Sequence, residues 1–379
     1  MVYAGSMVSL ARSSLLYQSK QYLPAVLSVA FAGLLVIVQI GLLLGMFRTA
    51  TLVVDQAPAE IWATSPGLQS VDLPQDIPSR TELRLMNSSS VKATDTLRNV
   101  GGDLRTADGA RLDVTVLGYS LRPGSVMWPR GFPESVRLAL REPDAIAVDD
   151  ADKGKLGVGI GSLVEINGHT ARVVALVKGF RAIGGVYVIA SREFVDRLSP
   201  GHGTVSYAAA TLEDSANADA VRDSLQVPGE NASSHLWTAE ELSRKSQLYW
   251  LLESGTGVGF LFSAALCLLV GLVITSQTLR AAVLSSLREY ATLRALGVPV
   301  SALRAVVLEQ AFWIGLVGLV VTGVSLVVVI AIARIGQISV YFPAWAILAT
   351  VVFIFALSFG AALLALRTLY QAEPAELLR

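Results

Sequence analysis

The chain has 379 residues, of which 53% are hydrophobic and only 16% are charged, and its formal net charge is zero. Soluble globular domains carry about 25% charged residues, so part of this chain is expected to lie in lipid. The lack of net positive charge argues against a nucleic-acid partner. The single cysteine, Cys267, excludes an internal disulfide, a Cys-x-x-Cys pair and a cysteine-based zinc cluster within one chain.

Four stretches are apolar over the roughly 20 residues that a helix needs to cross a membrane. The first follows a polar leader at 1–23, and it is longer than the apolar region of a signal peptide, which runs roughly 7–15 residues. We therefore interpret it as an uncleaved anchor. The four predicted transmembrane helices cover 24–47, 255–278, 308–333 and 346–366.

Gln39 is the unusual polar residue of the first predicted span. A side-chain amide at this depth either hydrogen-bonds to another helix or is simply tolerated. The sequence leaves both interpretations open.

The segment 48–254, between the first and second spans, is predicted to be a large mixed α/β domain. Within it, Asn-Gly separates two β-prone runs at 163–177, which is the strongest short-range sign of a β-hairpin. The apolar run 186–190 predicts a buried strand, and the pattern at 212–226 predicts an amphipathic helix. The predicted fold class is therefore a membrane α-helical protein with four transmembrane helices and a mixed α/β extracytoplasmic domain inserted between helices 1 and 2.

Proline- and glycine-rich stretches at 58–78 and 122–133 predict loops. The stretch GVGIGS at 157–162 resembles a phosphate-binding loop only superficially, because the motif G-x-x-x-x-G-K-[ST] does not occur anywhere in the sequence. Turn chemistry is expected there rather than nucleotide binding.

The residues before the second span predict a helical stalk at 238–254. Thr238 and Glu241 have the spacing of a capping box, which marks a helix start. Nothing in the sequence breaks this helix before Gly255, so the stalk is expected to continue through the second span to Leu296 as one rod. The three glycines in ESGTGVGF are the feature that could kink it.

The distribution of Lys and Arg predicts the orientation, because cytoplasmic loops carry an excess of these residues. The predicted outer side has only Arg48 and Arg334 close to the spans. The leader, the 279–307 loop and the 367–379 tail together carry eight basic residues, namely Arg12, Lys20, Arg280, Arg288, Arg294, Arg304, Arg367 and Arg379. Both termini and the 279–307 loop are therefore expected in the cytoplasm, and 48–254 and the short 334–345 loop outside it.

The 279–307 loop is predicted to begin as a helical extension of the second span. Gly297 suits the position just after a helix, Pro299 cannot continue it, and a second helix is expected to restart near Ser301. Arg288, Glu289 and Thr292 fall on the polar side of the first helix. The loop is either an ordinary basic cytoplasmic loop or a docking element for a soluble partner.

The stretch REYATLRALGVPVSALRAVVLEQAFWIGLVGLV, at 288–320, resembles the cytoplasmic loop of MacB/FtsX-type ABC transporter permeases. In that family an Arg-Glu pair precedes a leucine-rich turn ending in Leu-Gly, and a glutamate opens the next span. EYATLRALG, together with AFAGLLVIVQIGLLLGMF in the first span, is most similar to the DevC-type branch, the permeases of the heterocyst glycolipid exporter. The similarity covers both membrane ends, about half of the chain.

The resemblance implies a multi-pass permease of the bacterial inner membrane, without catalytic activity or a cofactor of its own. A separate ABC ATPase subunit, which binds the ATP, would dock at the 279–307 coupling loop. The chain would pair with a second permease copy, as a homodimer or with a paralogue, and work with a periplasmic adaptor protein and an outer-membrane channel. Motion passed to the outer domain would export a lipid-like or amphiphilic substrate.

On this resemblance, the ATPase-docking residues are Arg288, Glu289, Thr292, Arg294 and Gly297. Arg294 also lies near the apolar side of its helix, so packing against the bundle is its alternative role. Gln39 and Glu309 are predicted helix contacts, with Glu309 as a carboxylate at a helix start, favoured by the helix dipole. No catalytic, cofactor-binding or metal-binding residue is predicted, because His169, His202 and His235 are scattered without metal-ligand spacing.

Two other functions remain open from the sequence. An FtsX-like transmembrane regulator would use the same ATP-driven motion to activate a periplasmic enzyme, without exporting anything. A stand-alone sensor or receptor would have no ATPase partner. A secondary transporter is disfavoured by the small number of spans and the lack of an internal repeat.

Overall fold

The computed structural model describes residues 19–106, 109–201, 203–213, 217–226, 233–285, 299–336 and 338–371. The chain divides into two compact units. One unit comprises the chain up to Gly45 and from Gly257 onward, and the other is Met46–Thr256. A large domain is therefore inserted between the first and second long apolar helices.

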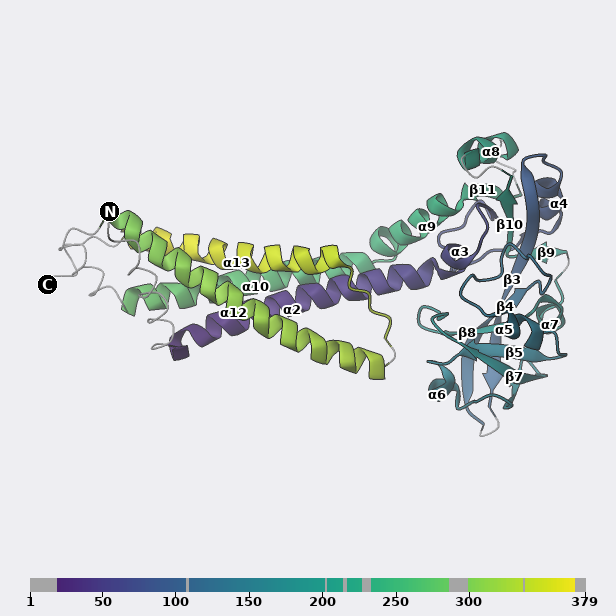
Figure 1. Ribbon diagram of the computed structural model, residues 1–379, viewed down its shortest axis with the longest axis horizontal. Helices are drawn as coiled ribbons and strands as arrows, with labels where there is room; N and C mark the ends of the chain where they lie inside the picture. The colour runs from purple at the N-terminus through teal and green to yellow at the C-terminus, as the bar shows by residue number, and fades with distance from the viewer. Residues whose placement is uncertain are drawn as a thin grey trace. The chain divides into compact units, whose positions relative to one another are not determined.

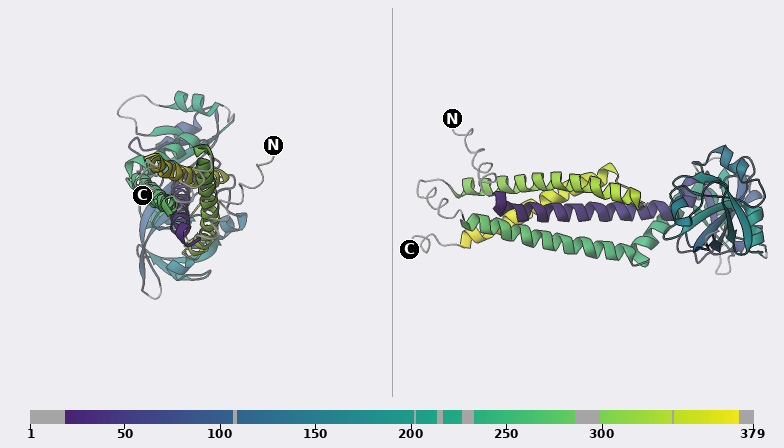
Figure 2. Two further views of the ribbon diagram at one scale, coloured as in Figure 1. Left: turned by 90° about the vertical axis from the view of Figure 1, so that its left-hand side faces the viewer. Right: turned by 90° about the horizontal axis from the view of Figure 1, so that it is seen from below.

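Four helices in the described residues are long and apolar enough to cross a membrane. They are α2 (Ser19–Ala50), α10 (Thr256–Ser285), α12 (Val300–Ile335) and α13 (Ala344–Gln371). Figures 1 and 2 show them running alongside one another, from purple α2 to yellow α13. This is the predicted membrane-helical fold.

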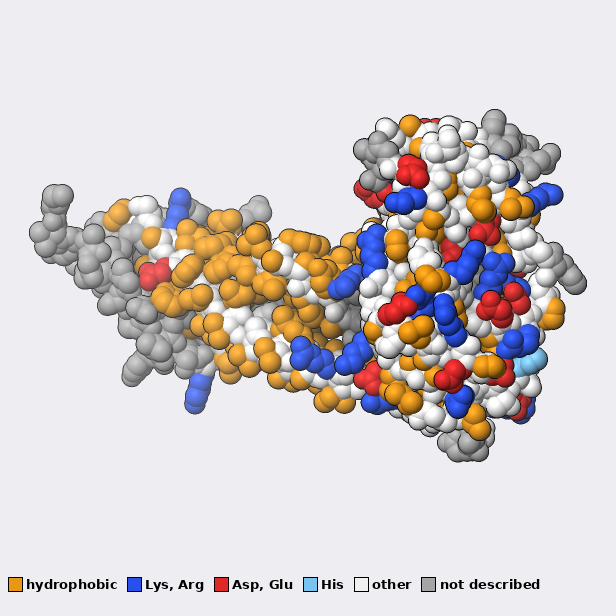
Figure 3. Space-filling view, turned by 45° about the vertical axis from the view of Figure 1, so that its right-hand side comes forward, with side chains coloured by type: hydrophobic (Ala, Val, Ile, Leu, Met, Phe, Trp, Pro, Cys, Tyr) orange, Lys and Arg blue, Asp and Glu red, His pale blue; other side chains and the backbone are white. Residues whose placement is uncertain are grey.

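Small residues let the four helices approach one another closely. The bundle core contains alanines of α2, α12 and α13, such as Ala25, Ala311 and Ala361, all of which are buried. Large apolar side chains such as Phe262 and Val327 point outward, more than half exposed. The space-filling view in Figure 3 shows this hydrophobic surface over the helices. Such packing by small residues is typical of helices in lipid, where large apolar side chains gain little by turning inward.

The inserted domain is built on a nine-stranded mixed sheet of order β11-β1-β10-β3-β4-β8-β5-β7-β6, with an additional β3–β6 pairing. This pairing closes the strands from β3 to β6 into a ring. Charged side chains are spread over the domain surface (Figure 3). The strands of the sheet are β1 (Ile61–Thr64), β3 (Val91–Arg105), β4 (Arg111–Tyr119), β5 (Ala145–Asp149), β6 (Leu163–Ile166), β7 (His169–Val177), β8 (Val186–Ser191), β10 (Tyr207–Leu212) and β11 (His235–Thr238).

A small second sheet pairs β2 (Ile77–Pro78) with β9 (Thr204–Val205). The domain also contains the π-helix η2 (Tyr249–Glu253). Its α-helices are α3 (Leu52–Gln56), α4 (Arg80–Met86), α5 (Glu134–Ala139), α6 (Lys153–Leu156), α7 (Arg192–Leu198), α8 (Ala218–Leu225) and α9 (Ala239–Leu248).

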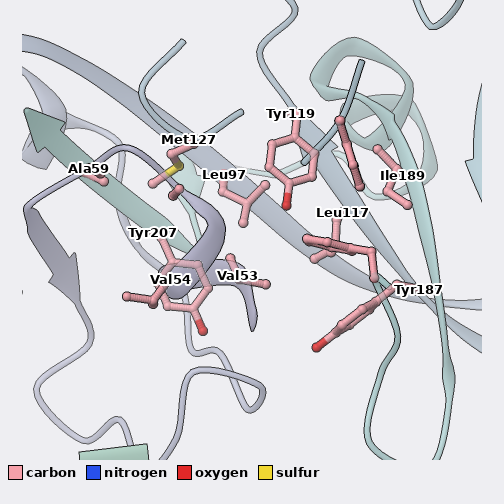
Figure 4. Packing of buried hydrophobic residues seen from close by; sticks show 14 of the residues in the cluster. Val53, Val54, Ala59, Leu97, Leu117, Tyr119, Met127, Tyr187, Ile189 and Tyr207 are labelled. Atoms are coloured by element: carbon pink, nitrogen blue, oxygen red, sulfur yellow. The ribbon is translucent and has the colours of Figure 1, made fainter. Parts of the chain in front are cut away.

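Strand β3 joins the two halves of the domain because it changes partner along its length. Its first half pairs with β10 up to Leu97, and its second half pairs with β4 from Arg98. The main core packs beneath this change of partner, where Leu97 and Leu117 lie beside Tyr119 and Tyr207 (Figure 4). A second core fills the ring of strands. Burial among these apolar side chains raises the pKa of Tyr207 well above its ordinary value, and the nearby Tyr187 raises it further.

Several local predictions are confirmed. The Asn-Gly turn joins β6 to β7, and both Asn167 (φ 49°) and Gly168 (φ 83°) adopt the positive φ that a tight hairpin turn requires. The strand predicted at 186–190 is β8. The helix predicted at 212–226 is shorter, because its first residue ends β10 and α8 begins only at Ala218.

The prediction of loops throughout 58–78 is wrong in part. Ile61–Thr64 forms β1, a fully buried strand between β10 and β11, and Ile77–Pro78 forms β2. The proline and glycine residues of this segment lie on either side of a strand too short to show its own periodicity.

Candidate functional site

The predicted ATPase-docking residues, Arg288, Glu289, Thr292, Arg294 and Gly297, lie outside the described residues. The helices that frame them are described. Helix α10 continues past the apolar span to Ser285. Pro299 has extended backbone (φ −71°, ψ 151°) and α12 begins directly after it, at Val300. The two ends of the loop are therefore direct extensions of two membrane helices.

Gln39 makes a hydrogen bond between two membrane helices. Its Nε2 donates to the hydroxyl oxygen of Ser263 on α10 over 2.6 Å. Of the two interpretations that the sequence left open, the structure shows the contact. The other half of the amide, Oε1, is buried without a hydrogen-bond partner among the described residues. This bond links α2 to α10.

Glu309 does not lie at a helix start, and this part of the prediction is wrong. Helix α12 begins at Val300, so Glu309 lies past its first two turns. The helix dipole acts on charges within the first turn, so it does not account for this carboxylate. The helix start expected near Ser301 agrees with the observed start at Val300, whereas Glu309 lies near the beginning of the apolar run at Leu308.

Two glycines of α2 allow the connection between α12 and α13 to pack closely against this helix. A Cβ at Gly41 would lie 2.1 Å from Phe342 Cε1, and a Cβ at Gly45 would lie 2.1 Å from the backbone oxygen of Ser339. The backbone N–H of Tyr341 donates to the oxygen of Gly41 over 3.0 Å. This contact was missed from the sequence, although the Gly-x-x-x-Gly spacing is the signal for close approach to a membrane helix.

The predicted capping box at the start of the stalk is present. Thr238 Oγ1 accepts from the backbone N–H of Glu241, and the Glu241 carboxylate accepts from the backbone N–H of Thr238. Arg222 of α8 also hydrogen-bonds to Glu241. Burial alone would raise the pKa of Glu241, but the bonds from Arg222 and Thr238 outweigh it and lower the pKa below its ordinary value of 4.5.

Three hydrogen bonds fasten α9 and η2 to the rest of the inserted domain. Ser243 Oγ donates to Asp55 of α3 over 2.6 Å. The hydroxyl of Ser246, which is fully buried, accepts from the backbone N–H of Val71 over 3.1 Å. The indole Nε1 of Trp250 donates to Asp72 over 3.1 Å. The stalk is therefore tied to the loop that contains residues 71 and 72.

The sequence predicted that the stalk and the second span form one continuous helix. The structure shows a break between them. Helix α9 ends at Leu248, η2 follows, and Gly255 adopts φ +77° before α10 begins at Thr256. A left-handed residue cannot continue a right-handed helix, and glycine adopts this conformation without steric cost. The break therefore falls at the first glycine of the stretch that the sequence marked as a possible kink.

Residues 261–374 match the family model described as FtsX-like permease C-terminal. The match runs from α10 through α12 to α13, so this part of the chain is similar to the C-terminal domain of FtsX-like permeases. No curated protein matches the chain.

Two solved structures are similar to part of this chain. The periplasmic region of MacB from Actinobacillus actinomycetemcomitans is 12% identical, with a TM-score of 0.35 over 50% of this chain and 94% of that chain. The extracellular domain of the noncanonic ABC-type transporter YknZ from Gram-positive bacteria is 15% identical, with a TM-score of 0.31 over 43% of this chain and 88% of that chain.

Proposed function

We propose that the chain is the transmembrane permease subunit of an ABC exporter of the bacterial inner membrane, driven by a separate ATPase subunit. The observation that carries this proposal is the FtsX-like permease match over α10, α12 and α13. The layout supports it, because one apolar helix, a large inserted domain and three further apolar helices follow one another in the chain. The chain itself would be non-catalytic, with ATP bound and hydrolysed by its partner.

The ATPase would dock at the 279–307 loop, on the cytoplasmic side that the basic residues favour. Arg288 and Glu289 would face the ATPase. Because α10 and α12 lead directly into the two ends of the loop, a displacement of the docked subunit would act on both helices at once. A second copy of the permease would provide the matching half of the assembly.

Motion would reach the inserted domain chiefly through α2. This helix runs without a break from Ser19 to Ala50, and α3 follows it at Leu52. The other connection contains Gly255 in a left-handed conformation, which bends more easily than a continuous helix. In this proposal the stalk follows the movement and α2 transmits it.

The export of a lipid-like or amphiphilic substrate, with a periplasmic adaptor and an outer-membrane channel as in the DevC-type branch, is the finer part of the proposal. An FtsX-like regulator of a periplasmic enzyme is the second candidate, because the matching family model is itself FtsX-like. Chemical crosslinking of the inserted domain in cells separates them. Capture of an adaptor protein supports export, whereas capture of a cell-wall hydrolase supports regulation.

The docking proposal is tested by pull-down of the ATPase subunit with a charge swap, Arg288→Glu with Glu289→Arg. We expect at least a severalfold weaker pull-down, because two charged contacts would become like-charge contacts. A matched control is the swap Arg172→Glu with Glu142→Arg, an ion pair of 2.7 Å on the inserted domain whose side chains are about half exposed. Wild-type pull-down by the loop variant, with unchanged thermal stability, would overturn the docking assignment.

A further inference from the structure

The inserted domain contains an open cavity of about 460 Å³ that the permease function does not use. This volume lies within the range of roughly 300–1,000 Å³ that is typical of small-molecule sites. The cavity lies between a loop and the sheet, at the place where β3 changes its partner. Its lining residues are Gln69, Asp72, Leu73, Pro74, Gln75, Asn99, Gly101 and Thr115.

The floor of the cavity is formed by β3 and β4. Gly101 pairs with Thr115 across the two strands, so the two residues share one face. A Cβ at Gly101 would meet no described atom within 4 Å, whereas a Cβ at the neighbouring Gly102 would lie 2.9 Å from Ile166 in the core. Packing therefore does not require a glycine at position 101. The absence of a side chain there leaves the cavity open above Thr115.

The wall of the cavity is a loop that is fixed by hydrogen bonds to the rest of the inserted domain. Val71 is buried, its N–H donates to Ser246, and its oxygen accepts from the hydroxyl of Tyr207. Gln75 Oε1 accepts from Ser65 over 2.9 Å. The loop thus has a fixed conformation without a ligand, which reduces the entropy that binding has to overcome.

Asp72 is oriented toward the cavity by donors on one side. Its Oδ1 accepts from the hydroxyl of Ser70 and from the indole N–H of Trp250. No described residue donates to the other oxygen, Oδ2, in any hydrogen bond of this structure. A carboxylate oxygen can accept two hydrogen bonds, so Oδ2 remains available as an acceptor.

The lining chemistry selects a particular class of ligand. Gln69, Gln75 and Asn99 each carry both donors and an acceptor, and Thr115 adds a hydroxyl. Among the described lining residues there is no Lys, Arg or His to hold an anion, and no described cluster of His, Cys, Asp and Glu could hold a metal. Leu73 and Pro74 offer too little apolar surface for an acyl chain.

We propose that this cavity binds an uncharged, hydroxyl-rich ligand of the saccharide class, with Asp72 and the three side-chain amides as its hydrogen-bonding groups. Hydroxyl groups are both donors and acceptors, and so are amides, so each such pair can be satisfied in either direction. The proposal does not depend on an ATPase partner.

Trp250 connects the cavity to the stalk. It belongs to η2, the segment of the chain that directly precedes α10. π-Helical turns often occur at functional sites. The indole N–H of Trp250 donates to the Asp72 carboxylate. A ligand that hydrogen-bonds to Asp72 polarises the same carboxylate, so ligand binding and the position of η2 are linked. Trp250 acts here as a positioning residue.

The test is calorimetric titration of the full chain, purified in a detergent without a sugar head group. The probes are maltotriose, sucrose and trehalose, with glucuronate, glucosamine and triglycine as charged and peptide counterparts. We expect saturable one-to-one binding of at least one neutral saccharide and weaker binding of every counterpart. No saturable saccharide binding, or tighter binding of a counterpart, would overturn the proposal.

Two matched variants locate the site. Gly101→Leu places a side chain in the cavity without a clash at Cβ, and it should abolish the binding. Gly159→Leu makes the same change at another glycine whose Cβ would meet nothing within 4 Å, outside the cavity, and it should bind as the wild type does. Trp250→Phe should weaken binding about two- to tenfold, the effect of one hydrogen bond, while thermal stability reports on folding. Full binding by Gly101→Leu would refute the location.

Discussion

Replacement of Gly45 by alanine tests the close contact between α2 and the α12–α13 connection. The new Cβ would lie 2.1 Å from the backbone oxygen of Ser339, and Cβ atoms essentially never approach closer than 3.0 Å, so the backbone has to move by roughly 1 Å. Overpacking of this kind costs about 1–3 kcal/mol. The higher helix propensity of alanine returns up to about 1 kcal/mol. We expect Gly45→Ala to lower the free energy of unfolding by about 1–2 kcal/mol.

The assay is thermal unfolding of the full chain in detergent, compared with Gly323→Ala. Gly323 lies in α12, and its Cβ would meet no described atom within 4 Å, so the same substitution there is expected to leave the midpoint unchanged or slightly raised. A lower midpoint for Gly45→Ala and not for Gly323→Ala is the predicted result. Equal midpoints for the two variants would refute the close approach at Gly45.

Three further predictions concern hydrogen bonds. A double-mutant cycle of Gln39→Leu and Ser263→Ala should give a coupling of about 0.6 kcal/mol in thermal stability, the average for bonds between membrane helices; zero coupling would contradict the α2–α10 bond. Thr238→Ala should cost about 1 kcal/mol by loss of the capping box, whereas Thr238→Ser should not. The lowered pKa of Glu241 means that its carboxylate stabilises the fold at neutral pH, and this contribution is lost as the pH falls below 4.5 through the folded-state pKa. Urea unfolding at neutral and acidic pH should therefore show a smaller acid loss for Glu241→Gln than for the wild type.

The parts of the fold that depend on a few neighbouring residues were predictable from local sequence signals. The Asn167-Gly168 turn and the Thr238 capping box are satisfied within one turn of backbone, so their chemistry is visible in the sequence. The apolar helices are equally visible, because each must satisfy its own backbone in lipid. These features required no knowledge of the tertiary structure.

Features that depend on distant contacts were not predictable in the same way. The cavity brings together loop residues such as Gln69 with Asn99 of β3 and Thr115 of β4, and nothing local marks them as neighbours. The buried strand β1 is a short run between proline-rich segments, and only its pairing with β10 and β11 makes it a strand. The left-handed Gly255 was one of several glycines, and the sequence does not say which of them breaks the helix.

The break at Gly255 changes the mechanical part of the proposed function. A single rod from the stalk through the second span would have transmitted a push directly, whereas α9 and η2 are fastened to the inserted domain by Ser243, Ser246 and Trp250. Helix α2 is the uninterrupted connection. A proline in α2, where it enters the inserted domain, should therefore impair coupling more than a proline in α9.

The side of the membrane on which the 279–307 loop lies tests the central claim most directly. Single cysteines are introduced into a Cys267→Ser background, Arg288→Cys in the loop and Ser89→Cys on the exposed surface of the inserted domain. Intact spheroplasts are then treated with a membrane-impermeant maleimide. The proposed docking of a cytoplasmic ATPase predicts that Ser89→Cys is labelled at once and Arg288→Cys only after the membrane is broken. Labelling of Arg288→Cys in intact spheroplasts would contradict it.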